Sequence, residues 1–406
     1  MIFPYLNPVS LLHYFLKREA DQFFASIAIR SFSLGMITIF VPIYLYYFFN
    51  SIPLTLLFFA AICGLNAILF PLGGEFMERV GVRRAMMISH PFYWGYYLCL
   101  LFLSQSIWLI PAAVLLCSLG SICFWPAFHT DFARFTERKE IGKEVGRLNF
   151  VSVLPGILAP AIGGAIVASY GYSTLFITVL CLLFASAIPL FLSKDIHQIY
   201  TDSYLKAYQR LKKPENKYHN LAFAANAMEG IINGYLWPLF LVVISVGYIS
   251  IGSIATVASF AAILFTLYVG RITDRMPKIR LLTIGSLLTF GAWIGKFFVV
   301  NPVSAFLAHS FYRLSRTSAT IPFQAIVYQK AKDKGPEVDE FIVYRDIVIN
   351  LSRFFLLLFL ACLFLIFPVV LKINYVFILA AFLSLGFVFL KGIPEWRELR
   401  LNWKEH

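Results

Sequence analysis

The chain contains twelve apolar stretches of about 20 residues each, and their length constrains the fold more than any other feature. A helix of about 20 apolar residues spans the roughly 30 Å hydrocarbon layer of a bilayer. Backbone groups cannot be left unpaired in lipid, and a transmembrane barrel would show short alternating segments instead. The sequence therefore predicts an all-α membrane protein whose twelve transmembrane helices cover residues 22–48, 54–75, 85–105, 107–130, 148–169, 172–193, 219–245, 249–269, 279–300, 303–327, 341–366 and 373–391.

The basic residues fall mainly on one side of the predicted membrane. Of the 34 Lys and Arg residues, Lys372 lies in a connection on the predicted outer side, and six lie within the spans, not counting Lys391 at the inner end of the last span. The others lie in the inner connections and the tails, as is typical of cytoplasmic segments. We therefore expect a multi-pass protein of the cell inner membrane with both termini in the cytoplasm. Topology then explains the net charge of +13, and no nucleic-acid partner is expected.

Composition and motifs argue against a soluble enzyme. The chain is 60% hydrophobic and 14% charged, with a mean hydropathy of +0.77. Its six cysteines lack metal-ligand spacing, and it has neither a zinc-binding HExxH motif nor a phosphate-binding Gly-Lys-Ser loop. We predict that the protein is not an enzyme and needs no metal or cofactor. Its expected partners are a small-molecule substrate and the lipid bilayer, and we expect a monomer.

The two halves of the sequence repeat one another at a constant shift of 196 residues. The matched pairs are Pro42 with Pro238, Gly74 with Gly270, Glu78 with Asp274, Arg79 with Arg275, Arg84 with Arg280, and Pro126 with Pro322. Such a parallel repeat predicts two six-helix bundles related by an axis along the membrane normal. The predicted parts are an interfacial N-terminal segment 1–21, a bundle 22–193, a cytoplasmic linker 194–218, a second bundle 219–391 and a cytoplasmic tail 392–406.

The connection between the second and third spans carries a recognisable motif. It reads Gly74-Glu75-Phe76-Met77-Glu78-Arg79-Val80-Gly81-Val82-Arg83-Arg84, and its second copy includes Gly270, Asp274, Arg275 and Arg280. This motif resembles the signature loop of the major facilitator superfamily. The resemblance implies transport by alternating access, with the acid and arginines of each loop binding neighbouring helix ends in one conformer. Glu78 stands where that family usually has Asp, and Pro277 replaces the Gly of the second copy.

Several predicted helices carry polar side chains along one face. In the tenth span His309, Arg313, Arg316, Thr320 and Gln324 follow steps of three or four residues, which places them on one face. Similar stripes comprise Asn226, Glu229, Asn233 and Trp237 in the seventh span; Ser118, Ser121, Trp125 and His129 in the fourth; Ser26, Arg30 and Ser33 in the first; and Asp346, Asn350 and Arg353 in the eleventh. In the resembled family, spans 1, 4, 7 and 10 line a central cavity. Gly230, Gly234 and Pro238 would let the seventh span bend.

The charges inside the spans favour an anionic substrate. Arg30, Arg313, Arg316, Arg345 and Arg353 outnumber Glu229 and Asp346, and Arg cannot relieve the surplus by losing protons. The predicted substrate-binding residues are Arg30, Arg313, Arg353, Asn226, Asn233, Trp125 and Trp237. An alternative reading pairs Arg316 and Arg345 with Asp346 and Arg30 with Glu229, and leaves Arg313 to a backbone carbonyl. Lys296, near the outer end of its span, is expected to extend its ammonium group to the membrane surface.

The coupling ion and the direction of transport stay open at this stage. Glu229 is the first candidate for a proton-binding group, followed by His309 and His129; Asp346, Arg316 and Arg345 complete the charge-pair candidates. The leading hypothesis is a secondary active transporter that moves a small anionic solute across the cytoplasmic membrane by a rocker-switch motion. The alternatives are a proton-coupled multidrug or metabolite efflux antiporter and a lipid flippase. The Gly156-to-Gly164 element resembles one of drug antiporters, although small residues there also permit close helix packing.

Overall fold

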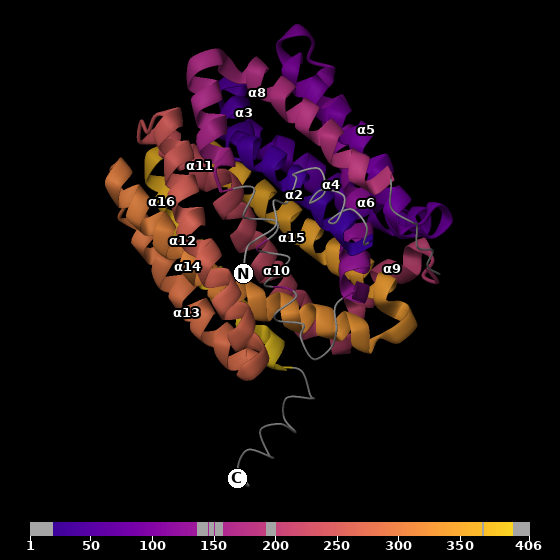
Figure 1. Ribbon diagram of the computed structural model, residues 1–406. Helices are drawn as coiled ribbons and strands as arrows, with labels where there is room; N and C mark the ends of the chain where they lie inside the picture. The colour runs from indigo at the N-terminus through magenta and orange to yellow at the C-terminus, as the bar shows by residue number, and fades with distance from the viewer. Residues whose placement is uncertain are drawn as a thin grey trace, which may run out of the picture.

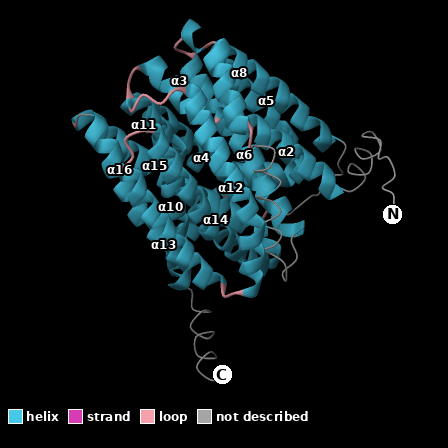
Figure 2. Cartoon of the chain, turned by 60° about the vertical axis from the view of Figure 1, so that its left-hand side comes forward, coloured by secondary structure: helices cyan, strands magenta, loops and turns pink. Residues whose placement is uncertain are grey.

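The computed structural model describes residues 19–135, 145, 150, 157–191, 200–367 and 369–392, and within these ranges the chain is helical without strands (Figures 1 and 2). The helices are α2 (Glu19–Ile37), α3 (Phe40–Phe49), α4 (Ile52–Val80), α5 (Val82–Leu101), α6 (Leu109–Phe135), α8 (Ala159–Phe191), α9 (Tyr204–Lys212), α10 (Lys217–Ile231), α11 (Trp237–Val243), α12 (Tyr248–Arg275), α13 (Lys278–Phe297), α14 (Pro302–Asp333), α15 (Val338–Ile366) and α16 (Val369–Leu385).

The predicted all-α membrane fold is confirmed, although several spans are divided or merged. The first span comprises α2 and α3, the seventh comprises α10 and α11, and α16 continues into a 3₁₀ segment, Gly386–Gly392. Helix α8 contains the sixth span and the described part of the fifth, with a bend at Gly171, whose φ of 81° suits glycine. Residues 1–18 and 393–406 lie outside the described residues, as does most of 148–156, so the predicted part boundaries stay predictions.

Length and hydropathy together identify six segments of the described chain as able to span a membrane. These are Phe24–Phe49, Ile52–Val80, Leu109–Ala133, Ala159–Phe191, Val338–Ile366 and Ile373–Leu390. The other predicted spans include α13 and α14, which contain Lys296, Arg313 and Arg316. Polar residues lower the mean hydropathy of a helix even where neighbouring helices bury them.

Two pairs of helices make the most extensive contacts between the halves: α4 packs along α15, and α8 packs against α12 (Figure 1). Within the first half, α8 also packs against α2. At Gly164 of α8, a Cβ atom would lie 2.5 Å from the carbonyl oxygen of Tyr248 in α12, and at Gly163 one would collide with the Met36 carbonyl. The two glycines thus permit close helix packing. This accounts for the described part of the Gly156-to-Gly164 element.

Helix α9 of the linker touches both halves, and we call the end of the bundle where it lies the linker end. Pro71 has no N–H group for the Ala67 carbonyl in α4, and the Tyr208 hydroxyl donates to that carbonyl at 2.8 Å. On the other half, Arg210 binds Glu337 at 3.0 Å and also Asp202. Burial alone would raise the pKa of Asp202, but hydrogen bonds from Arg210 and Lys206 lower it below its ordinary value.

Candidate functional site

A central cavity of about 420 Å³ lies between the two halves, against α4, α6, α10, α14 and α15. Its lining includes seven of the predicted substrate-binding and charge-pair residues: Trp125, His129, Asn226, Arg316, Arg345, Asp346 and Arg353. Asn66 of α4 donates to Asn350 of α15 at 3.2 Å and links the two halves across the cavity. At the linker end His129 of α6 is 2.7 Å from the Tyr328 hydroxyl of α14. The cavity is therefore polar and is bounded by contacts between the halves.

The arginines of the central cavity differ in their partners. Arg345 binds Asp346 through Nε at 3.0 Å and Nη2 at 2.6 Å, as one alternative reading expects. Arg353 has no ion pair with any residue that the structure describes, and its buried Nε lacks a hydrogen-bond partner. The Arg353 guanidinium thus lies at the cavity wall, and no described residue accepts a hydrogen bond from its Nε.

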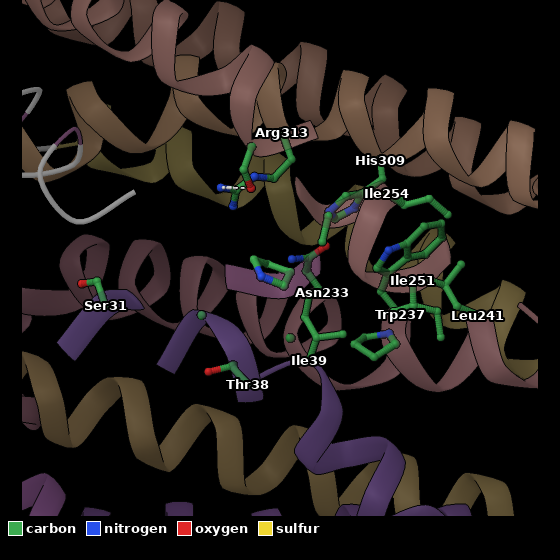
Figure 3. Close-up of a pocket in the computed structure, with 16 residues that line it drawn as sticks. Ser31, Thr38, Ile39, Asn233, Trp237, Leu241, Ile251, Ile254, His309 and Arg313 are labelled. Carbon is green, nitrogen blue, oxygen red and sulfur yellow. Dashed lines mark hydrogen bonds between the residues drawn. The ribbon is translucent and has the colours of Figure 1, made fainter. Parts of the chain in front are cut away.

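A second cavity of about 270 Å³ lies towards the end of the bundle where α11 is found, and we call it the α11-end cavity (Figure 3). It is bounded by α2, α8, α11, α12 and α14. Four predicted site residues line it: Asn233, Trp237, His309 and Arg313. A smaller cavity of about 110 Å³ is lined by Arg313, Arg316 and Thr320, so it adjoins residues of both larger cavities.

A π-helical turn divides the polar stripe of the seventh span between these cavities. Ile232–Leu236 forms this turn between α10 and α11, beside the predicted bend residues Gly230, Gly234 and Pro238. A π-turn shifts the register of all residues that follow it. Tyr235 consequently faces the central cavity, whereas Asn233 faces the α11-end cavity.

Glu229 lies inside the second half and lines neither cavity. Its carboxylate is fully buried and accepts hydrogen bonds from Trp293 Nε1 and the Tyr312 hydroxyl, both at 2.8 Å. Arg316 Nε lies 2.9 Å from the same carboxylate. The alternative pairings of Glu229 with Arg30, and of Arg316 with Asp346, are therefore wrong.

Lys296 is the functional candidate that sequence reasoning missed. The expectation that it reaches the membrane surface is wrong, because its side chain is fully buried. Its ammonium group donates to Asn233 Oδ1 at 2.8 Å and lies 3.7–4.2 Å from the ring centroids of Trp237, Trp293 and Tyr312. Such cation–π contacts offset part of the cost of burial. In the sequence, the three-residue spacing of Trp293 and Lys296 places both on one helix face and could have indicated this cation–π contact.

Arg30 lies outside both cavities, contrary to its predicted place at the substrate. Its guanidinium packs within the first half, 3.8 Å from the Phe124 ring centroid and 4.4 Å from that of Tyr93. The neighbouring Ser26 and Ser33 hydroxyls donate to backbone carbonyls of α8. The polar stripe of the first span therefore faces α8, and the expectation that it lines the cavity is wrong.

The first gating loop contains a required glycine and a buried ion pair. Gly81 joins α4 to α5 with φ 99° and ψ 155°, a conformation that is essentially restricted to glycine. Arg83, the neighbour of the predicted Arg84, binds Asp131 of α6 at 3.5 Å, and both side chains are almost fully buried. Arg84 itself is exposed. In this structure the buried ion pair of the loop is therefore formed by Arg83 and Asp131.

The charged residues predicted for gating lie at the linker end, and their side chains are half-buried or exposed, whereas Gly74 and Gly270 are buried. Glu78 is half-buried, and Arg79 is exposed with its guanidinium 4.0 Å from Glu75. Gly74 packs under the ring of Tyr200, where a Cβ atom would come within 2.7 Å. In the second copy Gly270 is buried, whereas three residues are exposed: Asp274, Arg275 and Arg280.

The fold and cavities define the class of this protein: a multi-pass helical membrane protein with a polar cavity between two six-helix halves. The sequence profile of the Major Facilitator Superfamily matches residues 23–336, and the chain belongs to this family of transporters. The chain is also similar to the crystal structure of the human organic anion transporter MFSD10 (TETRAN). That match has a TM-score of 0.67 and 11% identity and covers 93% of this chain and 100% of the other, so it concerns the fold. No sequence relative was found among curated proteins.

Proposed function

We propose that this transporter is a secondary active carrier of a small anionic solute, which it binds in the central cavity. Arg353 is the observation that carries the proposal. Its guanidinium lines the cavity without an ion pair in the described part of the chain, and its geometry suits a carboxylate or phosphate. Arg345 and Arg316 also line the cavity, but each already binds a carboxylate. Arg353 would therefore be the first cation to bind an incoming anion.

The charge balance that remains after internal pairing supports an anion. When Arg345 is paired with Asp346 and Arg316 with Glu229, Arg313 and Arg353 still lack a carboxylate partner within the described residues. Arg keeps its charge when it is desolvated. A bound anion would offset both the buried charge and the unused donors. The similar human structure is that of an organic anion transporter, which is in keeping with this substrate class.

Alternating access is the proposed mechanism, with the solute crossing the cell inner membrane and both termini in the cytoplasm. Contacts between the two halves lie towards both ends of the central cavity, and they would open in turn. At the linker end they include His129 with Tyr328, and towards the α11 end Phe59 stacks on Tyr235 with ring centroids 3.8 Å apart. Each contact joins the first half to the second. Rocking of one half against the other would break one set while the other set stays closed.

Glu229 is the proposed proton-coupling group. Its carboxylate holds Arg316, whose guanidinium also lines the central cavity. Protonation of Glu229 would remove that ion pair and release Arg316 to a substrate anion, so proton binding and anion binding would favour one another. Glu229→Gln should abolish proton-driven accumulation while it spares exchange of substrate across the membrane. Loss of neither activity would remove Glu229 from the coupling step.

The substrate proposal is tested by transport in liposomes. Purified protein is reconstituted, and uptake of mixed anionic, neutral and cationic metabolites is followed with and without a proton gradient. Arg353→Gln should abolish uptake of each transported anion, whereas Arg353→Lys keeps the charge and should retain part of it. Lys334→Gln, at an exposed position outside the cavities and the gating loops, serves as the control. Unchanged anion uptake by Arg353→Gln would rule out the anion site at this residue.

A further inference from the structure

The α11-end cavity has the features of a binding site in its own right. Its apolar wall comes mainly from three residues each of α11 and α12, together with Ile39 and with Pro160 of α8 (Figure 3). Its polar lining residues are Ser31, Thr38, Asn233 of the π-turn, Ser259 of α12, and His309 and Arg313 of α14. None of the residues that line it is acidic. A concave apolar pocket with a few convergent polar groups is the usual form of a small-molecule site.

Arg313 supplies the charge of this cavity. Among the described residues its guanidinium makes one hydrogen bond, from Nη2 to the Ser259 hydroxyl at 3.3 Å, and no carboxylate pairs with it. The ionisable groups around it are Arg316, Lys296, His309 and Tyr312, and none of them is an acid that could balance its charge. A guanidinium with one long hydrogen bond to a neutral hydroxyl has donors left for an anion.

His309 is the second and independent indication of a ligand. Its ring is 7% exposed, and its Nδ1 has no hydrogen-bond partner. The ring stacks on Trp237 with centroids 5.5 Å apart and an interplanar angle of 8°. A buried polar atom at a cavity wall normally has a partner, so this nitrogen indicates a group that occupies the cavity.

We infer that the α11-end cavity is a second anion-binding subsite, which takes a monocarboxylate with a small flat apolar body. The carboxylate binds Arg313, and His309 lies one helical turn away to receive a further polar group. The apolar body lies between the Trp237 indole and aliphatic side chains such as Ile251 and Ile254. This subsite is distinct from the Arg353 site of the central cavity.

The inference rests on the proposed function and adds a second binding position for the anion on the same transport pathway. Helix α14 contributes Arg313 to the α11-end cavity and Arg316 to the central cavity, and both line the small cavity that adjoins them. An anion that enters from the α11 end would therefore meet Arg313 before it meets Arg353. Successive weak sites allow a solute to bind and also to leave.

Equilibrium dialysis of the purified full-length protein with radiolabelled benzoate tests this arrangement. Wild-type protein should bind two benzoate molecules per chain, and the neutral isostere benzamide should not compete. Loss of a hydrogen-bonded charge costs about 1.5–3 kcal/mol, so Arg313→Gln should weaken one site about 10- to 150-fold and leave the other unchanged. Arg353→Gln should weaken the other site, and Lys334→Gln should change neither.

The outcomes separate the two proposals. One benzoate per chain, lost in Arg353→Gln and kept in Arg313→Gln, would overturn the subsite and leave the central site standing. One benzoate, lost only in Arg313→Gln, would support the subsite and contradict the central anion site. Ser259→Ala removes only the hydroxyl beside Arg313, so it provides a milder variant if Arg313→Gln fails to fold. Unaltered benzoate affinity in both Ser259→Ala and Arg313→Lys, with strong competition by benzamide, would also refute the subsite.

Discussion

Gly164→Ala should open the α11 end of the protein. Gly164 lies in α8 of the first half, and the Tyr248 carbonyl that faces it belongs to α12 of the second half. An added Cβ would lie 2.5 Å from the carbonyl oxygen and 3.2 Å from its carbon. Both neighbouring atoms are backbone, so no side-chain rotation can relieve the overlap. The two helices must move apart, and this contact is one of those that join the halves.

The size of the effect follows from the kind of contact. Overpacking of a close-packed site costs about 1–3 kcal/mol. The cost applies only while α8 and α12 touch, because a state that is open at the α11 end has already separated them. Since about 1.4 kcal/mol corresponds to a factor of ten, the ratio of open to closed molecules should rise about 5- to 150-fold.

Electron–electron distance measurements between spin labels can detect this shift. Tyr170 of α8 and Ile249 of α12 are both more than half exposed and suit labelling. Gly291→Ala is the matched control, because a Cβ at Gly291 meets nothing within 4 Å. The longer distance should gain population in Gly164→Ala alone. Identical distance distributions in the two variants, with both proteins folded, would refute the argument.

Three further changes test other parts of the structure. Glu229→Ala leaves Arg316 buried without its carboxylate, so apparent stability in a detergent melt should fall by about 3–5 kcal/mol, and Glu229→Gln should lose less. The lowered pKa of Asp202 means that its ion pair with Arg210 stabilises the linker above the ordinary carboxyl pKa of about 4 and is lost as the pH falls below it. The protection of the α9 amides from hydrogen exchange, relative to the intrinsic exchange rate at each pH, should therefore fall in acid, and at neutral pH in Asp202→Asn. Gly81→Ala should cost about 1–3 kcal/mol through its φ of 99°, measurable as a lower unfolding temperature.

The sequence could predict the fold and the polar wall of α14 because both depend on local regularities. Span length sets the helices, and an unbroken helix keeps residues three and four apart on one face. His309, Arg313, Arg316, Thr320 and Gln324 accordingly all line cavities. The stripe of the seventh span was not predictable to the same degree. The π-turn at Ile232–Leu236 changes its register, and neither periodicity nor composition reveals such a turn.

Contacts between distant elements account for the other differences. Lys296 on α13 is buried because Asn233 and Trp237 reach it from the seventh span, and no local pattern relates residues some 60 positions apart. Arg30 carries the same polar signal as Arg313. Its helix, however, turns that face towards α8 and the Phe124 ring. The sequence identifies which residues need a partner in the membrane, but tertiary packing decides whether that partner is protein or solute.

Sequence differences between the two copies of the repeat indicate that the two halves have different roles. At the constant shift of 196 residues, the buried ion pair of Arg83 and Asp131 corresponds to Ile279 and Val327, so the second half cannot form the same ion pair. Conversely, the deep arginines correspond to uncharged residues of the first half: Arg313 to Cys117, Arg316 to Gly120 and Arg353 to Ile157. A duplicated fold explains the shared helices, whereas these one-sided charges cannot serve the fold in both copies. Arg313 and Arg353, which have no carboxylate partner in the described part of the chain, are therefore the second-half charges that the proposed anion sites would account for.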